Sequence, residues 1–362
     1  MKRIKLVIPI LAVFLIMSGK SFSQDTDIQK FFKNFGIVTY IDTYYSTDND
    51  KSAGSNPRMF DLLSPYRDQF GLNIAQVSLR YGTEKIRGTF TLHYGDIPDV
   101  NWAPVTRAKF VQEANVGFSP VKNLWIDGGY FVTHIGAESF PKFNYFSSFS
   151  LPSAYEPFLQ SGVRVSYDFS EKFTACVHIL NGFNVFEDNN KNKSAGVQLV
   201  YSPNEKLKLT YNNIIGNEQP DGMAGKMRML NNFIVNASPC EKLELTAAVD
   251  YGMQEHSKLS DLTKSASYYG FSLAGRYNIA PKYSVSVRGD YFEDLDGVVS
   301  AYAPNTGGVK ANSVTIGCEY RPVDLAYLRF EYRYLRTAAE QKIFQDNSNS
   351  RSEATVSLGL EF

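Results

Sequence analysis

The chain has 362 residues, with 37 basic and 37 acidic side chains, so its formal net charge at pH 7 is zero. This balance argues against a nucleic-acid partner and against a polybasic protein bound to a membrane surface. Aromatic residues, mostly Tyr and Phe, make up 14% of the chain, and only three cysteines occur. Because three is an odd number and the spacing forms no framework, the cysteines favour neither a disulfide scaffold nor a metal site.

The first 23 residues have the organisation of a secretory signal peptide. Three basic residues open the chain, a short uncharged apolar run follows up to Met17, and Ser21–Phe22–Ser23 has the small-x-small form of a cleavage site. The apolar run is shorter than the ~20 residues that a helix needs to cross a bilayer. We therefore expect a signal peptide at 1–23, a short periplasmic segment at 24–34 and a folded barrel at 35–362.

Beyond residue 34, segments of alternating apolar and polar residues predict strands joined by two kinds of connection, which alternate strictly. Short turns, several of them with a Ser-Pro pair, are expected at 82–84, 119–122, 170–171, 202–205, 238–241, 280–281 and 321–324. Long polar loops are expected at 46–68, 96–109, 134–156, 183–192, 217–225, 255–263, 294–309 and 337–350. These connections join about sixteen strands, an even number that places both chain ends on one side.

This pattern predicts an all-β fold, a transmembrane antiparallel up-and-down β-barrel with long outer loops and short periplasmic turns. A charge on the lipid face costs ~2–4 kcal/mol near the midplane, which explains why the apolar face stays free of charge. Sixteen strands tilted by ~40° close to a backbone diameter of roughly 30 Å, which leaves room for an aqueous channel. The alternation is irregular near 70–81 and 226–237, where we expect a bulge or a shifted strand boundary.

The chain ends on a strand that alternates without a fault and finishes with an aromatic residue. Val356, Leu358, Leu360 and Phe362 share its apolar face. In an exported chain, this ending is typical of the insertion signal of bacterial outer-membrane barrels. We therefore expect the barrel-assembly machinery and outer-membrane lipid as partners, and the bacterial outer membrane as the location of the protein.

The predicted inner face carries charges of both signs in near balance, which argues against strong ion selectivity. The candidate pore-lining residues are Arg80, Arg87, Glu113, Asp127, Arg164, Glu244, Asp250, Arg276, Arg288, Asp290, Glu319, Arg329, Glu331 and Arg333. Opposite charges facing each other across a constriction would create a transverse field that favours polar solutes. The alternative is that these groups form inter-strand salt bridges, which stiffen the wall, or simply solvate it.

The third long loop, extended to Phe158, is strongly aromatic. Its candidate constriction residues are Phe140, Phe143, Tyr145, Phe146, Phe149 and Tyr155. Apolar side chains in such number usually mark a contact surface. We expect the loop to fold into the barrel and narrow it, although its aromatic rings could instead pack on the barrel rim or extend the outer aromatic girdle.

Three blocks of sequence carry a family resemblance. They are FGIVTYIDTYY at 35–45, EANVGFSPVKNLWIDGGYFVTHIGAES at 113–139 and YEPFLQSGVRVSYDFSEKFTACVHILNGF at 155–183. These blocks resemble the putative beta-barrel porin family of Bacteroidetes. The resemblance implies a barrel fold and a porin function, and it supplies no catalytic residue to carry over.

The sequence therefore predicts a porin for passive diffusion of small hydrophilic solutes, with no catalytic residue, no cofactor and no metal. Two alternatives stay open: a channel specific for a sugar or an amphipathic solute, and a non-conducting structural or secretion-partner barrel. A homo-oligomer is open by analogy. An enzyme is disfavoured because no Ser–His pair occurs on the outer face, and an energy-coupled receptor would need a plug domain larger than residues 24–34.

Overall fold

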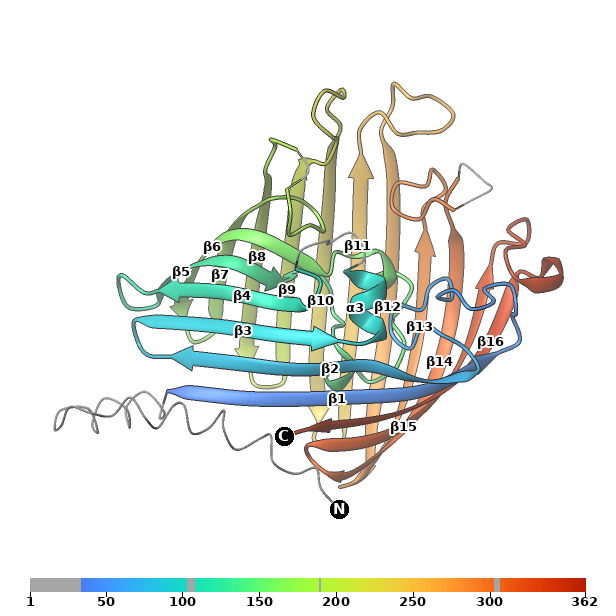
Figure 1. The fold of residues 1–362 in the computed structure, drawn as a ribbon, viewed down its shortest axis with the longest axis horizontal. Coiled ribbons are helices and arrows are strands. Elements are labelled where there is room, and N and C mark those ends of the chain that lie inside the picture. The colour runs from blue at the N-terminus through green and yellow to red at the C-terminus, as the bar shows by residue number, and fades with distance from the viewer. Residues whose placement is uncertain (1–33, 103–107, 189, 303–306) are drawn as a thin grey trace, which may run out of the picture.

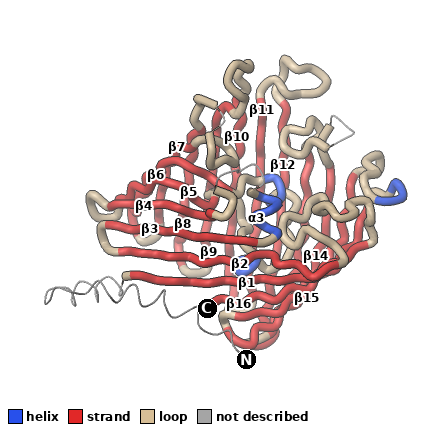
Figure 2. The backbone as a smooth tube through the Cα atoms, viewed as in Figure 1, coloured by secondary structure: helices blue, strands red, loops and turns tan. Residues whose placement is uncertain are grey.

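The computed structural model describes residues 34–102, 108–188, 190–302 and 307–362. The expected signal peptide and all but the last residue of the expected segment 24–34 lie outside these residues. Within them, sixteen strands form one closed antiparallel barrel in which each strand pairs with its neighbour in sequence (Figures 1 and 2). The predicted fold is therefore confirmed. No helix in the described part of the chain is long and apolar enough to cross a membrane.

The strands are β1 (Phe35–Asp48), β2 (Gln69–Gly82), β3 (Ile86–Tyr94), β4 (Val111–Phe118), β5 (Leu124–Val132), β6 (Leu159–Ser170), β7 (Phe173–Leu180), β8 (Ser194–Asn204), β9 (Leu207–Asn217), β10 (Met227–Cys240), β11 (Leu243–Gln254), β12 (Ala266–Ala280), β13 (Tyr283–Glu293), β14 (Lys310–Val323), β15 (Ala326–Thr337) and β16 (Ser350–Glu361). Short helices lie in the loops: α3 (Asp96–Asn101), η1 (Pro141–Phe143), η2 (Ser153–Tyr155) and η3 (Gln345–Asn347). The barrel closes where β1 pairs with β16, with Tyr40 opposite Glu361.

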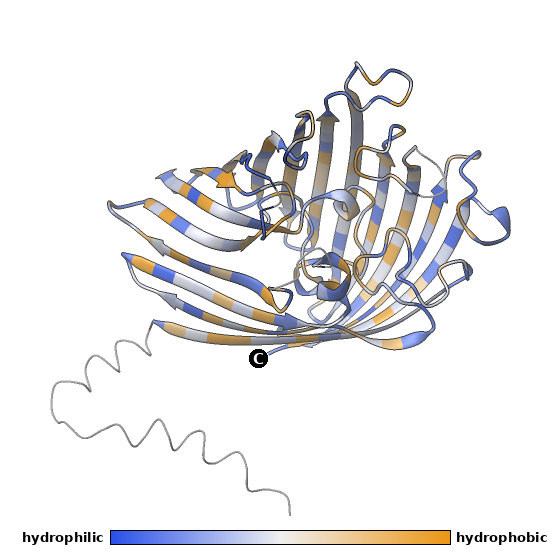
Figure 3. Ribbon diagram, turned by 45° about the horizontal axis from the view of Figure 1, so that its top comes forward, coloured by the Kyte–Doolittle hydropathy of each residue, from blue (hydrophilic) through white to orange (hydrophobic). Residues whose placement is uncertain are grey.

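Side chains alternate between the two faces of the wall, as the period of a strand requires. On β15, Leu328 and Phe330 are exposed on the outer face, whereas Arg329 and Glu331 are buried on the inner face. Figure 3 shows the same alternation of hydrophobic and hydrophilic residues along many strands. An apolar outer face is what a barrel embedded in lipid requires.

The predicted long loops all match observed connections, but several of the predicted short turns lie a few residues too early in the chain. The expected turns 202–205 and 238–241 are wrong in position, because β8 and β10 continue to Asn204 and Cys240. Both strand pairings shift register just before the turn, so Pro203 and Pro239 lie at bulges. A bulge leaves a residue outside the hydrogen-bond ladder, and a proline, which has no N–H, is tolerated there. The expected turn 321–324 was displaced in the same way, since β14 ends at Val323.

The two irregular segments have different origins. In the first, the pairing of β1 with β2 shifts between Asp42 and Thr43, which confirms the bulge expected near 70–81. In the second, β10 pairs with β9 without a shift from Met227 to Ala237 and continues to Cys240, which confirms the shifted strand boundary.

Loops occupy part of the barrel interior. Side chains of the loops 49–68, 95–110 and 133–158, here called the first, second and third loops, are buried against inward-facing wall residues in two hydrophobic clusters. Phe60 and Leu151 belong to one cluster, and Trp102 and Phe149 belong to the other. Figure 1 shows α3, which lies in the second loop, inside the barrel. Since side chains from the wall of a sixteen-stranded barrel cannot fill its lumen, the loops supply this apolar core.

Candidate functional site in the barrel lumen

The tip of the third loop is held by an arginine of the opposite wall. Arg329 on β15 donates hydrogen bonds of 2.9 Å to the carbonyl oxygens of Asn144 and Phe146, and one of 3.3 Å to that of Pro141. Its guanidinium also pairs with Glu319 on β14 at 2.7 Å. Because one side chain binds three loop carbonyls, the path of the loop tip is tied to β15.

The middle of the loop is bound to β13 and β15 in the same way. Arg288 on β13 donates to the carbonyl oxygens of Ser148 and Phe149, each at 2.9 Å. Glu331 on β15 accepts a hydrogen bond of 2.6 Å from the backbone N–H of Ser147. The loop thus leaves the barrel wall at β5 and reaches strands on the far side of the barrel before it returns to β6.

The end of the loop meets an acidic site on β10 and β11. The amide of Asn232 donates to Glu156 at 3.3 Å and to Asp250 at 2.6 Å, so the two carboxyl groups share one donor. Burial, and then the neighbouring Asp250 carboxyl, raises the pKa of Glu156 above its usual range. Gly136 has φ +99 and packs directly on Glu156, so a side chain there would meet that carboxyl group.

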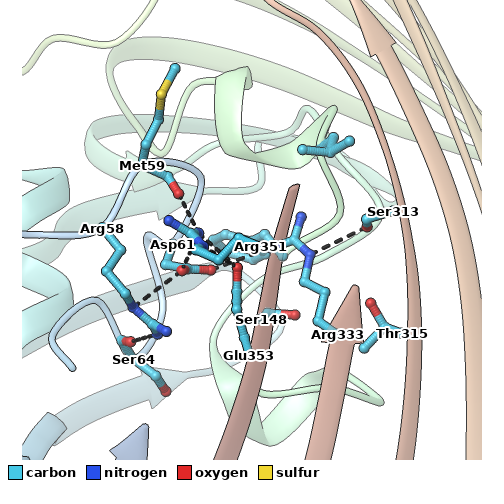
Figure 4. A network of polar contacts seen from close by, with 12 residues as sticks. Arg58, Met59, Asp61, Ser64, Ser148, Ser313, Thr315, Arg333, Arg351 and Glu353 are labelled. Carbon is cyan, nitrogen blue, oxygen red and sulfur yellow. Dashed lines mark hydrogen bonds and ion pairs between the residues drawn. The ribbon is translucent and has the colours of Figure 1, made fainter. Parts of the chain in front are cut away.

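The first loop enters the same lumen through a network of arginines and carboxylates (Figure 4). Asp61 accepts hydrogen bonds from Arg333 at 3.2 Å and from Arg351 at 2.9 Å, and it pairs with Arg58 at 3.3 Å. Burial raises the pKa of the Asp61 carboxyl to about 6, against the opposing effect of the guanidinium groups. Arg351 also pairs with Glu353 at 2.7 Å.

Sequence reasoning missed four members of this network. Arg351 and Glu353 occupy inward positions of the last strand, so the alternation that ends at Phe362 could have identified them. Arg58 and Asp61 lie in an irregular loop, where no periodicity indicates which side chains point inward.

The structure divides the predicted pore-lining residues by their access to water. Arg288, Arg329 and Arg333 are at most 1% exposed, because the first and third loops cover them. Five acidic candidates are also buried on the inner face: Asp127, Asp250, Asp290, Glu319 and Glu331. By contrast, the side chains of Arg87 and Arg164 are 36% and 32% exposed, and both pair with Asp127, at 2.5 and 3.2 Å.

Of the remaining candidates, Glu113, Glu244 and Arg276 are partly exposed and Arg80 is exposed. Arg276 on β12 pairs with Glu319. Arg80, Glu113 and Glu244 form no ion pair among the described residues, although Arg80 contacts the hydroxyl of Ser78 at 3.3 Å. The structure thus assembles the predicted charges into separate groups rather than into one site.

Five of the six predicted constriction residues are packed inside the barrel. Phe140, Phe146 and Phe149 are buried, and Tyr155 stacks on Phe292 with ring centroids 4.5 Å apart. Tyr145 is partly buried under the guanidinium of Arg276, whose central carbon lies 5.7 Å from the ring centroid. Phe143 is the exception, with 66% of its surface exposed.

The lumen offers hydrogen-bonding and charged groups for polar solutes. The described residues contain no cluster of three or more His, Cys, Asp or Glu side chains that could hold a metal ion. The three cysteines are free, Cys176 buried and the other two exposed. What this arrangement can do chemically is bind and orient solutes by hydrogen bonds and charge.

Comparisons with known proteins agree with this architecture. A model of the family described as Putative beta-barrel porin-2, OmpL-like matches residues 34–362. A search of curated proteins found no match. Among solved structures, the chain is similar to the anion-selective porin from Comamonas acidovorans, with 11% identity, a TM-score of 0.63, and coverage of 91% of this chain and 99% of that one.

Two further solved structures share the fold. The outer membrane channel DcaP of Acinetobacter baumannii is 10% identical, with a TM-score of 0.64 and coverage of 91% of this chain and 97% of that one. The trimer form of OmpT from Vibrio cholerae is 13% identical, with a TM-score of 0.58 and coverage of 91% and 99%. At these identities the likeness concerns the fold alone.

Proposed function

The chain belongs to the Putative beta-barrel porin-2, OmpL-like family, and on this premise we propose that it passes small hydrophilic solutes by passive diffusion across the outer membrane. Such a role needs no cofactor and no chemical step. Selectivity would come from the width of the path and from the charges that line it.

The unequal exposure of the inward arginines carries this proposal. Arg87 and Arg164 are about one-third exposed, whereas Arg288 and Arg329 on the far wall are covered by loops. Water therefore reaches the wall from β3 to β6, and we place the diffusion path along it. Here Asp127 pairs with two guanidinium groups, so charges of both signs lie on this wall.

The third loop would narrow this path. Its hydrogen bonds to Arg288, Arg329 and Glu331 support a fixed position across the lumen, since three charged side chains of the far wall bind it. Charge-assisted hydrogen bonds are roughly twice as strong as neutral ones. The loop would therefore act as a fixed constriction.

Single-channel conductance in planar bilayers tests the proposal. The purified protein should conduct, and liposomes that contain it should swell with sugars up to a size limit. Deleting residues 140–155 should enlarge the conductance, whereas shortening the exposed loop 255–265 should leave it unchanged. A barrel that conducts at no voltage would refute the porin function, and an unchanged conductance after the deletion would refute the constriction.

Three further expectations belong to the same proposal. We propose that residues 1–23 are removed on export and that the terminal apolar face, ending at Phe362, is read by the barrel-assembly machinery. We also propose a homo-oligomer, since OmpT of Vibrio cholerae has a trimer form. N-terminal sequencing of the mature protein and its mass in detergent would test the first and last points.

A further inference from the structure

A cavity of about 450 Å³ lies where the first, second and third loops meet the loops 181–193 and 294–309. These are outer loops, so the cavity lies on the outer side of the proposed path. Its wall combines apolar and polar surface in similar measure. Leu62, Val100, Ala154 and the rings of Phe158 and Phe183 supply the apolar part. The polar groups of its wall include Asn101, Glu156, Asn184 and Arg228. Convergent polar groups beside apolar surface can fix the orientation of a small molecule that carries both kinds of group.

Arg228, at the outer end of β10, has no carboxylate within 4.0 Å among the described residues. Its Nε donates to the side-chain oxygen of Gln254 at 2.7 Å, and one terminal nitrogen donates to the carbonyl of Val298 at 3.4 Å. The guanidinium also lies over the ring of Phe183, 5.5 Å from its centroid. In contrast, Arg288 and Arg351 are each paired with carboxylates. Arg228 is therefore held in place without a counter-charge.

Two acidic groups beside this cavity, Glu156 and Asp294, already accept hydrogen bonds from the protein. Glu156 shares the amide of Asn232 with Asp250, and burial raises its pKa, which favours the neutral acid. Asp294 accepts hydrogen bonds of 2.9 Å from the backbone N–H groups of Val298, Val299 and Ser300. These three donors hold the carboxylate within its own loop, so Arg228 keeps an excess positive charge in the cavity.

A second donor faces the same space. The side-chain oxygen of Asn184 accepts hydrogen bonds from the backbone N–H groups of Phe158 and Leu159, at 2.8 and 3.1 Å. This arrangement fixes the amide and leaves its NH₂ group without a partner in the described residues. Arg228 and Asn184 therefore supply donors, while Phe158 and Phe183 supply apolar surface.

We infer that this cavity, here called the anion vestibule, binds small organic monoanions that carry a carboxylate on an apolar body. The guanidinium of Arg228 would bind the carboxylate through charge-assisted hydrogen bonds, and the aromatic rings would cover the body. The inference deepens the proposed function and rests on it, because the vestibule lies at the outer entrance of the proposed diffusion path. The vestibule would make the channel select for such anions over neutral molecules of the same shape.

Current block by a matched pair of solutes tests the inference. 3-Phenylpropionate and its neutral analogue 3-phenylpropanol are added in turn to one side of a bilayer that contains the channel. The carboxylate should block the current in a concentration-dependent way, from the outer side, and the alcohol should do so far more weakly. Arg228→Gln keeps a hydrogen-bonding side chain but removes the charge. It should raise the Kd for the carboxylate by about tenfold or more and leave that for the alcohol unchanged.

Arg336→Gln is the matched control. Arg336 lies on β15 at the same end of the barrel as Arg228, but its side chain is exposed on the outside of the barrel wall. Its loss should therefore leave the block unchanged. Equal block by the two solutes, or equal Kd values for wild type and Arg228→Gln, would overturn the vestibule. If the channel still conducts in that case, the porin function stands. Calorimetric titration of 3-phenylpropionate in detergent measures binding without conductance, and so tests the vestibule separately from the porin function. Binding that depends on Arg228 in a barrel that never conducts would uphold the vestibule and refute the porin.

Discussion

The hydroxyl oxygens of Ser147, in the third loop, and Ser357, on β16, lie 2.7 Å apart inside the barrel. The two residues are 210 positions apart in the chain. This hydrogen bond joins the middle of the loop to the terminal strand. It gives a direct way to test the position of the loop in the membrane.

Replacing both residues, as Ser147→Cys with Ser357→Cys, should allow a disulfide to form. The hydroxyl separation is compatible with the ~2.05 Å S–S bond after a small adjustment. The native cysteines should first be replaced, because Cys240 and Cys318 are exposed. Oxidation should produce a faster-migrating band on non-reducing gels and leave the conductance unchanged. A pair that fails to cross-link under oxidising conditions would place the loop elsewhere.

Neutralising Asp127 should shift the channel toward anions. Its carboxylate compensates the exposed guanidinium groups of Arg87 and Arg164, so Asp127→Asn leaves two uncompensated positive charges on the proposed path. The reversal potential in a KCl gradient should move in the anion-selective direction. The loss of charge-assisted hydrogen bonds should cost about 1–3 kcal/mol of stability. Asp261→Asn, in the exposed loop 255–265, is the control, and an equal shift in both variants would contradict the assignment.

Docking of the third loop should weaken as the pH rises. Burial, together with Asp250 on β11 and Glu138 of the same loop, raises the pKa of Glu156 in the docked state. The docked loop therefore binds the proton more tightly than the released loop. The stability that this proton provides is complete below the ordinary carboxyl pKa and is lost as the pH rises through the raised value.

Conductance measured against pH checks this expectation. Wild type should show a larger or noisier conductance at high pH, because release of the loop widens the path. Glu156→Gln mimics the protonated form and should remove the dependence. Should the variant retain the full pH response, a group other than Glu156 controls it.

The terminal residue should matter for closure as well as for export. The backbone N–H of Thr39 donates to the carbonyl of Phe362 at 2.8 Å, and the N–H of Phe362 donates to the carbonyl of Thr39 at 3.0 Å. Deleting Phe362 removes this pair at the seam between β1 and β16, and about 1–3 kcal/mol of stability with it. Heat-modifiability on gels should show a lower melting temperature, and Phe362→Tyr should behave like wild type.

Refolding into detergent separates the two roles of Phe362. A deletion variant that refolds in detergent but does not reach the outer membrane in cells has lost its recognition signal. A variant that assembles normally in cells would contradict the insertion-signal assignment.

The local sequence pattern was sufficient to predict the barrel, because apolar and polar residues alternate with a period of two along each strand. Leu328 and Arg329 could be assigned to opposite faces from their neighbours alone, since lipid excludes charge from one face. The predicted turn positions were wrong where Pro203 and Pro239 suggested a turn. A bulge that tolerates proline depends on pairing with the next strand, which the proline's own neighbours do not reveal.

The sequence by itself therefore determined the number of strands, the alternation of long loops with short turns and the face of most strand residues, because these follow from periodicity and chain order. Only the tertiary structure decided which inward charges stay accessible. Glu331 meets Ser148 across 183 residues and Arg333 meets Asp61 across 272, and irregular loops carry no period that could predict such contacts. The same packing covers Arg288 and Arg329 on one wall of the lumen and leaves Arg87 and Arg164 on the other about one-third exposed.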